Sequence, residues 1–532
     1  MLWPYGGGTT SRRRTDRDGE AAAGGGNPCR ALWVPLRPSP DAVISETFRL
    51  PVPVPASELF AWHERPGAFE RLTPPWQTVR VEHMEGIRTG DRAVFRVGPG
   101  PGVRWVAEHR DTSDACLPDA DGGTGGGMCQ FTDVQVEGPF ASWTHAHRMI
   151  ADGAGASILE DHIEAALPGG ALAEMVGGPT ARAEFDRMFG YRHRVTASDL
   201  ARHAAWQSAH GERRLTVAIS GASGLLGRAL AAFLTGGGHR VVRLVRSRGQ
   251  AGALRRGPAE QTVYWNPAAD AADLGSAIDM GALRQAAPDA IVHLAGEPVF
   301  GLAYTAEKKR RIWESRTRGT DLIARAAAQL DPRPVLVSAS ASGYYGSRGD
   351  AEITEADGPG TGFLADVCRA WEAATAPAEA AGVRTVHLRT GLALSPAGGM
   401  LGVLGTVTGL GLGGWVGSGQ DVWPWIAADD WVYAVHHLLG LADARGPYDL
   451  SAPEPAESKA FVKTLAGVLN RPAFASVPRA LVRAFGGEAA QEVALASVRM
   501  LPARLLDSGF AFSYPSLEPA LRHLYGRTAR TS

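Results

Sequence analysis

The chain has 532 residues and a formal net charge of −1, a length that suits roughly two to four domains. A charge this close to neutral gives no electrostatic support for nucleic acid or an anionic membrane as the main partner. The four cysteines lie far apart without the spacing of a metal site, which favours a reducing, cytoplasmic setting. The uncharged stretch 390–420 is too rich in glycine for a membrane span, so we expect a glycine-rich loop and helix there.

Residues 1–41 are rich in Gly, Arg, Asp and Pro, and we expect a disordered tail. After it, alternation of apolar and polar residues predicts antiparallel strands at 44–52, 78–85, 92–98, 103–111, 129–137, 142–150 and 157–167. Two short helical stretches, ASELFAWHE and GAFERLTP, follow the first strand, and a long helix is predicted over 179–208. Residues 119–127 are expected to form a loop tip. The pattern predicts an α+β domain over 42–208.

This order of elements, with the phrases VEGPFASWTHAHRM and RMFGYRHRVTASDL, resembles the helix-grip fold of the START/polyketide-cyclase-like superfamily. The resemblance implies an apolar cavity for a hydrophobic ligand; the alternative is a small domain with a filled core. His145 and His147 alternate along one predicted strand and share a face. We find no acidic residue or third histidine in register with them, and therefore predict no metal site.

From residue 212 the pattern changes to alternating strands and helices. An apolar run, RLTVAIS, leads into glycines at 221, 224 and 227, then a helical segment and a second strand over 240–246. A strand, a glycine turn, a helix and a strand are the context that a dinucleotide-binding loop requires. The glycines let the backbone approach a pyrophosphate, and the helix that starts near Leu225 directs its positive end at that charge.

The end of the second strand carries Arg246 and no acidic residue before Glu260. An arginine there pairs with a 2′-phosphate, whereas a carboxylate would accept hydrogen bonds from a ribose hydroxyl. We therefore predict NADP(H) in preference to NAD(H). The alternative is a solvated surface arginine.

Further apolar strands are predicted at 289–296, 334–346 and 384–394, separated by helices at 305–330, 363–381 and 429–443. Alternation of this kind predicts a doubly wound parallel Rossmann sheet, with its ligand at the carboxyl ends of the strands. We assign 212–455 to this domain and 456–532 to a carboxy-terminal helical lobe, with helical segments over 479–486 and 487–500.

Several motifs of the second half resemble the atypical and extended short-chain dehydrogenase/reductases, and in particular the bacterial "epimerase family protein" group with a carboxy-terminal domain of unknown function. They are EKKRRIWESRTRGT, SASASGYYG, LRTGLALSPAGGML, GSGQDVWPWIAADD and SVRMLPARLLDSGFAFSYPSLEPAL. Some members of that group carry a cyclase-like domain in front.

The resemblance implies roles for individual residues. Those expected to hold the pyrophosphate are Gly221, Ser223, Gly224, Leu225, Leu226 and Gly227, with Arg246 at the 2′-phosphate. Those expected around the rest of the cofactor and the substrate carbonyl are Leu294, Ala295 and Gly296 behind the ribose, Ser338 and Ser340 at a strand end, and Arg389 and Thr390 near the nicotinamide.

The sequence departs from that class at its catalytic pair. The expected tyrosine and lysine positions hold Phe363 and Val367, and no lysine occurs between 310 and 458. We expect Tyr344 or Tyr345 to be the replacement acid, with Ser340 orienting the carbonyl oxygen and a water in place of the lysine relay. Arg316, Arg318 or Arg389 would be the positively charged neighbour that stabilises the phenolate of that tyrosine. The alternative is that both tyrosines only pack a strand end.

Other polar residues favour structural roles. Asp429 and Asp430 are expected at the N-cap and in the first turn of a helix, and His293 in a core strand. The sequence thus predicts an NADP(H)-dependent oxidoreductase or epimerase-like enzyme for a small carbonyl or hydroxyl substrate. The alternatives are a nucleotide-binding regulatory protein without turnover, and a hydrophobic-ligand binder acting through the first domain.

Overall fold

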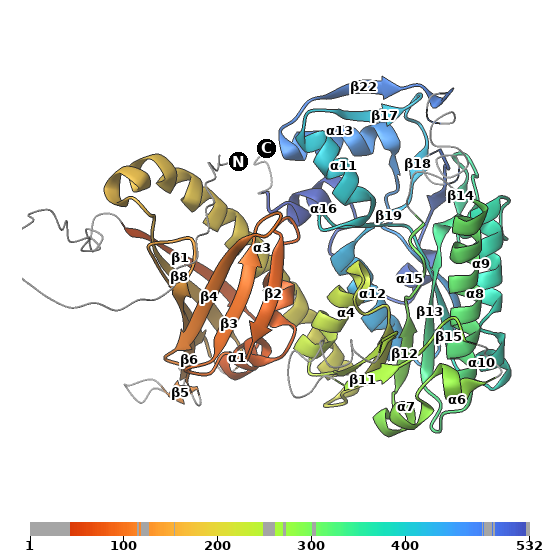
Figure 1. Ribbon diagram of the computed structural model, residues 1–532, viewed down its shortest axis with the longest axis horizontal. Coiled ribbons are helices and arrows are strands. Elements are labelled where there is room, and N and C mark those ends of the chain that lie inside the picture. Colours follow the sequence, from red (N-terminus) through yellow and green to blue (C-terminus); the bar gives the residue numbers. More distant parts are fainter. Residues whose placement is uncertain are drawn as a thin grey trace, which may run out of the picture.

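The computed structural model describes residues 43–113, 116–118, 127–153, 155–247, 261–269, 273–299, 305–480, 482, 492 and 495–527. In Figure 1 a curved sheet with one long helix stands beside a larger α/β unit. No helix within the described ranges is both long and apolar enough to cross a membrane. The predicted tail 1–41, most of the loop tip 119–127 and most of the helical segments expected over 479–500 lie outside the described residues.

The first unit is an antiparallel sheet packed against a long helix. Its strand order is β1-β8-β7-β6-β4-β3-β2, with β5 paired to β6. The strands are β1 (Val43–Val52), β2 (Val79–Met84), β3 (Arg92–Val97), β4 (Val103–Arg110), β5 (Leu117–Pro118), β6 (Gly127–Glu137), β7 (Ser142–Ala151) and β8 (Ser157–Ala166). Helices α1 (Ala56–Glu64) and α2 (Ala68–Leu72) follow β1, and α3 (Gly170–His210) follows β8.

These strands and the short helices confirm the predicted elements of the first unit. The long helix begins earlier than predicted, because it continues through Gly177, Gly178 and Pro179, residues that usually end helices. The expectation of four separated cysteines was wrong for one pair. Cys116 and Cys129 form a disulfide, because β5 pairs antiparallel with the beginning of β6, and the argument for a reducing setting loses that support.

The second unit contains a parallel sheet in the order β11-β10-β9-β12-β13-β15-β20, which confirms the doubly wound prediction. The strands are β9 (Thr216–Ser220), β10 (Arg240–Val245), β11 (Gln261–Tyr264), β12 (Ala290–His293), β13 (Val335–Ala341), β15 (Thr385–Thr390) and β20 (Gly446–Leu450). The helices that pack around it are α4 (Leu225–Gly236), α6 (Leu274–Ala277), α7 (Met280–Ala286), α8 (Ala306–Ala328), α9 (Phe363–Ala373), α10 (Ala376–Ala380) and α12 (Ala428–Gly440).

Smaller elements extend from the carboxyl ends of these strands. They are the 3₁₀ turn η2 (Ser342–Tyr345), the helices α11 (Gly399–Gly409), α13 (Ser458–Leu469), α15 (Ala503–Asp507) and α16 (Leu517–Leu524), and the short strands β14 (Glu352–Ile353), β16 (Leu392–Leu394), β17 (Gly413–Val416), β18 (Val422–Trp423), β19 (Trp425–Ala427), β21 (Ala456–Glu457), β22 (Ala473–Val477) and β23 (Arg499–Met500). Trp423, Trp425, Phe461 and Leu521 share one buried core. These elements therefore share a core of their own, separate from that of the central sheet.

The two units meet around one buried arginine. Arg71, at the end of α2, donates two 2.8 Å hydrogen bonds to Asp199 of α3 and pairs with Asp429 of α12 at 2.8 Å. Asp429 also lies 2.9 Å from His523 of α16, and Tyr433 donates to Asp199 at 2.7 Å. Burial opposes ionisation of Asp429, but the charge of Arg71 outweighs it and lowers the pKa of that carboxyl.

This network corrects the expectation for the two acids of α12. Both lie in the first turn, but Ala427 is the N-cap residue. Asp430 accepts backbone hydrogen bonds from Ser513 and Tyr514. Asp429 therefore joins α12 to the first unit, and Asp430 joins it to the carboxy-terminal lobe. The spacing of residues in the sequence does not reveal these contacts.

Replacement of Arg71 by alanine should destabilise the whole chain. It would leave Asp199 and Asp429 buried without their counter-charge, which costs on the order of 3–5 kcal/mol. Urea unfolding followed by circular dichroism measures the effect. Arg49→Ala is the matched control, since Arg49 is mostly exposed in its pair with Glu160 and should contribute about 1 kcal/mol or less. Equal losses in the two variants would contradict the role given to Arg71.

Candidate cofactor and active site

The glycine turn joins β9 to α4. Gly221 has φ of 74°, a left-handed conformation that side chains rarely adopt, and an added Cβ would lie 2.9 Å from the backbone of Leu294. A Cβ at Gly227 would lie 2.3 Å from the carbonyl oxygen of Gly221. The turn and its packing therefore require glycine at these two positions.

Gly224 is less constrained than these two glycines. Its φ is −74°, it is exposed, and an added Cβ would meet the carbonyl oxygen of Gly221 at 3.2 Å among the described residues. Ser223 is exposed beside it, and Leu225 and Leu226 are half-buried at the start of α4. The amino end of a helix with an open backbone approach suits an anionic group such as a pyrophosphate.

Arg246 directly follows β10 and is exposed. The strand itself carries no carboxylate. Arg243, within the strand, donates to the carbonyl oxygen of Ala222 at 3.2 Å and so joins β10 to the glycine turn. An exposed guanidinium at this strand end fits a 2′-phosphate better than a ribose diol.

The end of β12 is held against the turn by a buried serine. The Ser220 hydroxyl accepts the backbone N–H groups of Leu294 and Ala295 at 3.2 and 3.4 Å and lies 2.6 Å from His293 Nδ1. Burial lowers the pKa of His293 to about 4, so the ring is neutral at pH 7. The prediction of a core histidine is confirmed, and Gly296 continues this segment beside the guanidinium of Arg316.

The serines predicted at the end of β13 are both buried. Ser340 donates to Glu372 of α9 at 2.7 Å, and Arg389 binds the same carboxylate through Nε at 2.9 Å and Nη2 at 2.8 Å. Ser338 makes a long contact of 3.4 Å with the carbonyl oxygen of Ala339. Contacts of Ser338 and Arg389 with a cofactor stay predictions, and both residues are buried within β13 and β15.

Tyr345 belongs to the same closed network. Its hydroxyl donates to Asp449 at 2.8 Å and accepts from Arg389 at 2.9 Å. Burial, followed by the charge of Asp449, raises the pKa of Tyr345, and burial, followed by the charge of Glu355, raises that of Asp449. A phenol held protonated among buried partners acts as a structural group at neutral pH.

Tyr344 is placed differently although it is the next residue in the chain. Its ring is half-buried, with the guanidinium carbon of Arg389 3.5 Å from the ring centroid. Its hydroxyl has no hydrogen-bond partner in the part of the chain that the structure describes. Ser342, which the sequence analysis did not select, is the first residue after β13 and is also half-buried. These two residues are the more accessible hydroxyls at this strand end.

The positions of the usual catalytic pair lie on α9. Val367 is buried, and the ammonium nitrogen of Lys309 lies 5.0 Å from the centroid of the Phe363 ring. A lysine of α8 thus reaches the place where the family's tyrosine would stand. The sequence analysis overlooked Glu372 and Lys309, because neither occupies the expected spacing.

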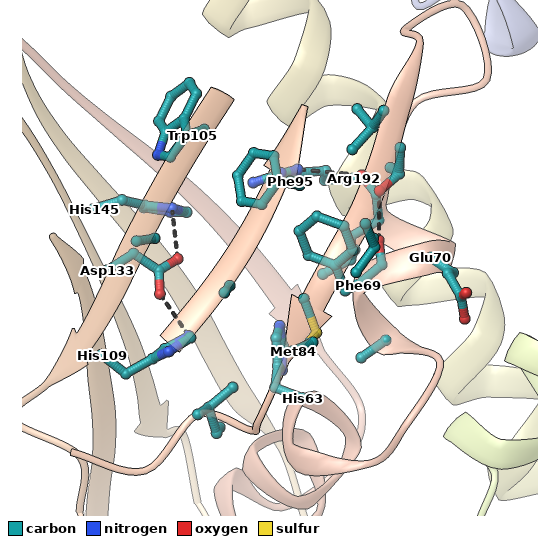
Figure 2. A pocket seen from close by; sticks show the side chains of 18 of the residues that line it. His63, Phe69, Glu70, Met84, Phe95, Trp105, His109, Asp133, His145 and Arg192 are labelled. Carbon is teal, nitrogen blue, oxygen red and sulfur yellow. Dashed lines mark hydrogen bonds and ion pairs between the residues drawn. The ribbon is translucent and has the colours of Figure 1, made fainter. Parts of the chain in front are cut away.

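The first unit holds a second candidate site, a cavity of about 410 Å³. Aromatic side chains line much of it, and Figure 2 shows Phe69, Phe95 and Trp105 around the space. Asp133 faces the same cavity between His109 and His145. The cavity combines an apolar wall with one polar end.

Strand register creates that polar end. Asp133 of β6 pairs with His145 of β7, and His147 pairs with Asp161 of β8. The sequence analysis found no acidic residue in register with these histidines, which was wrong because the pairing of separate strands is not visible in the sequence. Burial disfavours charge on His147, but the neighbouring carboxylates of Asp133 and Asp161 raise its pKa to about 9. Burial lowers the pKa of His145 to about 4.

The fold and the glycine turn together define an NAD(P)-binding Rossmann protein of the short-chain dehydrogenase/reductase kind. The chain matches the NAD dependent epimerase/dehydratase family over residues 217–450 and a domain of unknown function, DUF1731, over 477–524. It is 36% identical over 306 residues to an epimerase family protein of Mycobacterium bovis, covering 57% of this chain and 96% of that relative. The chain belongs to this epimerase family.

Two solved structures extend the comparison. A nucleoside-diphosphate sugar epimerase from Corynebacterium glutamicum is 32% identical, covers 90% of each chain and has a TM-score of 0.70, so the likeness includes much of the first unit. Human epimerase family protein SDR39U1 with NADPH is 28% identical and has a TM-score of 0.50, covering 58% of this chain and 99% of its own.

Two glycines of the turn should respond differently to substitution. Gly224→Val should abolish NADPH binding without unfolding the chain, because the side chain fills the open approach to the turn. Gly227→Ala should instead destabilise the fold, because its Cβ would collide with Gly221. Calorimetry of NADPH binding and thermal unfolding distinguish the two. Unchanged NADPH affinity in folded Gly224→Val would show that this glycine serves only the turn.

Proposed function

We propose that the protein is an NADP(H)-dependent oxidoreductase or epimerase of the atypical short-chain class, acting on a small carbonyl or hydroxyl substrate. The observation that carries this proposal is the exposed glycine turn after β9, together with the exposed Arg246 after the neighbouring strand β10. The NADPH named with the human relative supports the choice of cofactor. The cofactor, when bound, supplies or accepts the hydride.

NADPH should bind more tightly than NADH, and Arg246→Ala should remove most of that preference. Charge-assisted hydrogen bonds to the 2′-phosphate contribute on the order of 1.5–3 kcal/mol, or about 10- to 150-fold in affinity. Calorimetric titration with both cofactors measures the ratio. Arg284→Ala, an exposed arginine of α7, is the control and should keep the preference. Equal affinities in the unchanged protein would refute the assignment.

Tyr344 is the proton donor in this proposal. The guanidinium of Arg389 stacks on its ring and fixes the ring's orientation, while Glu372 accepts hydrogen bonds from Nε and Nη2 of that guanidinium. Ser340 does not contact the substrate in this proposal, because its hydroxyl donates a hydrogen bond to Glu372. Ser342, at the strand end, takes over the orienting role that the sequence analysis gave to Ser340. A water replaces the lysine relay.

Tyr344→Phe should lower turnover by on the order of 10²–10⁴, the usual loss for a general acid, with little change in stability. Tyr345→Phe should mainly lower the unfolding temperature, because it removes hydrogen bonds to Asp449 and Arg389. Nicotinamide absorbance during incubation with a library of small carbonyl compounds provides the assay, and thermal unfolding the second readout. Normal turnover of Tyr344→Phe would place the acid elsewhere.

The same assay separates the enzyme from a regulatory protein. The missing tyrosine–lysine pair at Phe363 and Val367 favours a nucleotide-binding protein without turnover, whereas the accessible Tyr344 favours an enzyme. Tight NADPH binding with no turnover of any compound in the library would favour a regulatory protein over an enzyme.

The cavity favours a second function for the first unit. Its curved antiparallel sheet, two short helices after β1 and long final helix support a helix-grip, START-like domain. The cavity of about 410 Å³ has aromatic walls and the guanidinium of Arg192, features that suit an amphipathic ligand with an apolar body and an anionic end. Saturable displacement of a fluorescent fatty acid from the full chain tests this function, and its absence would count against it.

A further inference from the structure

The polar end of the cavity has the geometry of a metal site. Asp133, His145 and His147 each offer one ligand atom, and these atoms lie within 4.8 Å of one another. All three residues face the cavity from the adjacent strands β6 and β7. They come from rigid, paired strands, which hold a ligand set more precisely than loops do.

The separations between the donor atoms fit a single ion. His147 Nε2 lies 3.5 Å and His145 Nδ1 lies 3.9 Å from the same oxygen, Asp133 Oδ2. Ligands about 2.1 Å from a tetrahedral zinc ion are about 3.4 Å from each other. The rings and the carboxylate are thus spaced to coordinate an ion after small side-chain rotations.

A second carboxylate lies behind the histidines. Asp161 Oδ1 is 3.0 Å from His145 Nε2 and 2.8 Å from His147 Nδ1, the nitrogens that face away from Asp133. Asp161 is buried and does not line the cavity, and His193 of α3 binds its other oxygen at 2.8 Å. Metal-binding histidines almost always donate the far N–H to a carboxylate, which fixes the orientation of the ring. His145 makes this hydrogen bond with Asp161, whereas His147 Nδ1 is close to Asp161 without a directed hydrogen bond.

The carboxylate that faces the cavity has remaining capacity. Asp133 Oδ1 is buried, and although His109 Nε2 is 2.8 Å away, the two do not form a directed hydrogen bond. The other oxygen, Oδ2, is the one nearest to His145 and His147, so the contact with His109 leaves Oδ2 available to a cation.

We propose that Asp133, His145 and His147 bind one divalent first-row transition metal ion, with Asp161 as the positioning residue behind them. Two imidazoles and a carboxylate suit zinc and its neighbours. Three protein ligands leave at least one coordination position open to the cavity, where a water or an anionic group of a ligand can bind. The proposal is independent of turnover in the second unit.

Calorimetric titration of the metal-stripped full chain with Zn²⁺ tests the site. We expect one ion per chain, and a loss of affinity of about 100-fold or more in Asp133→Asn and in the double variant His145→Gln/His147→Gln. His83→Gln is the control, because His83 is exposed on β2 and its loss should leave the stoichiometry unchanged. Circular dichroism verifies that each variant is folded. Absence of stoichiometric binding, or binding that persists in the folded double variant, overturns the proposal.

Asp161→Asn tests the positioning role separately. Loss of an outer carboxylate typically weakens metal binding 10- to 100-fold, so we expect one ion per chain at that lower affinity. Co²⁺ in place of Zn²⁺ gives a second readout, since its visible spectrum reports the geometry of the ligands. We expect the band to change shape in Asp161→Asn and to stay unchanged in His83→Gln. An unchanged affinity and spectrum would overturn the role of Asp161, and if Asp161→Asn fails to fold, His193→Gln replaces it in the same comparison.

Discussion

The arrangement of the molecule depends on the buried charge of Arg71. A guanidinium in a protein interior must be paired, and here its two carboxylates come from α3 and α12, helices of different units. Helix α4, which carries the glycine turn at its amino end, packs against both α2 and α12. The cofactor turn is therefore part of the interface, and the two units form one folded body in which neither surface is free to separate without exposing an unpaired ion.

Local features of the fold were predictable from the sequence. Alternation of side chains located the strands of the first unit, and the glycine turn was recognisable because its strand, turn and helix are consecutive in the chain. Pairings between distant segments were not. Asp133 meets His145 through strand register, Cys116 meets Cys129 through a strand pair, and Arg71 meets Asp429 across 358 residues of sequence separation, the difference between their numbers. No periodicity encodes such contacts.

The candidate active site shows the same limit. The motif SASASGYYG predicted a site at the end of β13, yet it could not separate the two tyrosines. The structure does so with residues from α9, β15 and β20: Glu372, Arg389 and Asp449 enclose Tyr345 and leave the hydroxyl of Tyr344 accessible. The polar network of the second unit is closed on itself, whereas the histidine and aspartate cluster of the first unit opens on a cavity. The first kind stabilises a fold, and the second is available to a ligand.

The wall of that cavity has a consequence for the cofactor. Thr235 and Arg243 belong to the nucleotide-binding unit, yet both line the cavity of the first unit. Arg243 also donates to the carbonyl oxygen of Ala222, inside the glycine turn. One side chain thus touches both candidate sites, so a cavity ligand that shifted Arg243 would change the free energy of the turn. Thermodynamic linkage makes the effect mutual: whatever factor the ligand imposes on dinucleotide affinity, the dinucleotide imposes on the ligand.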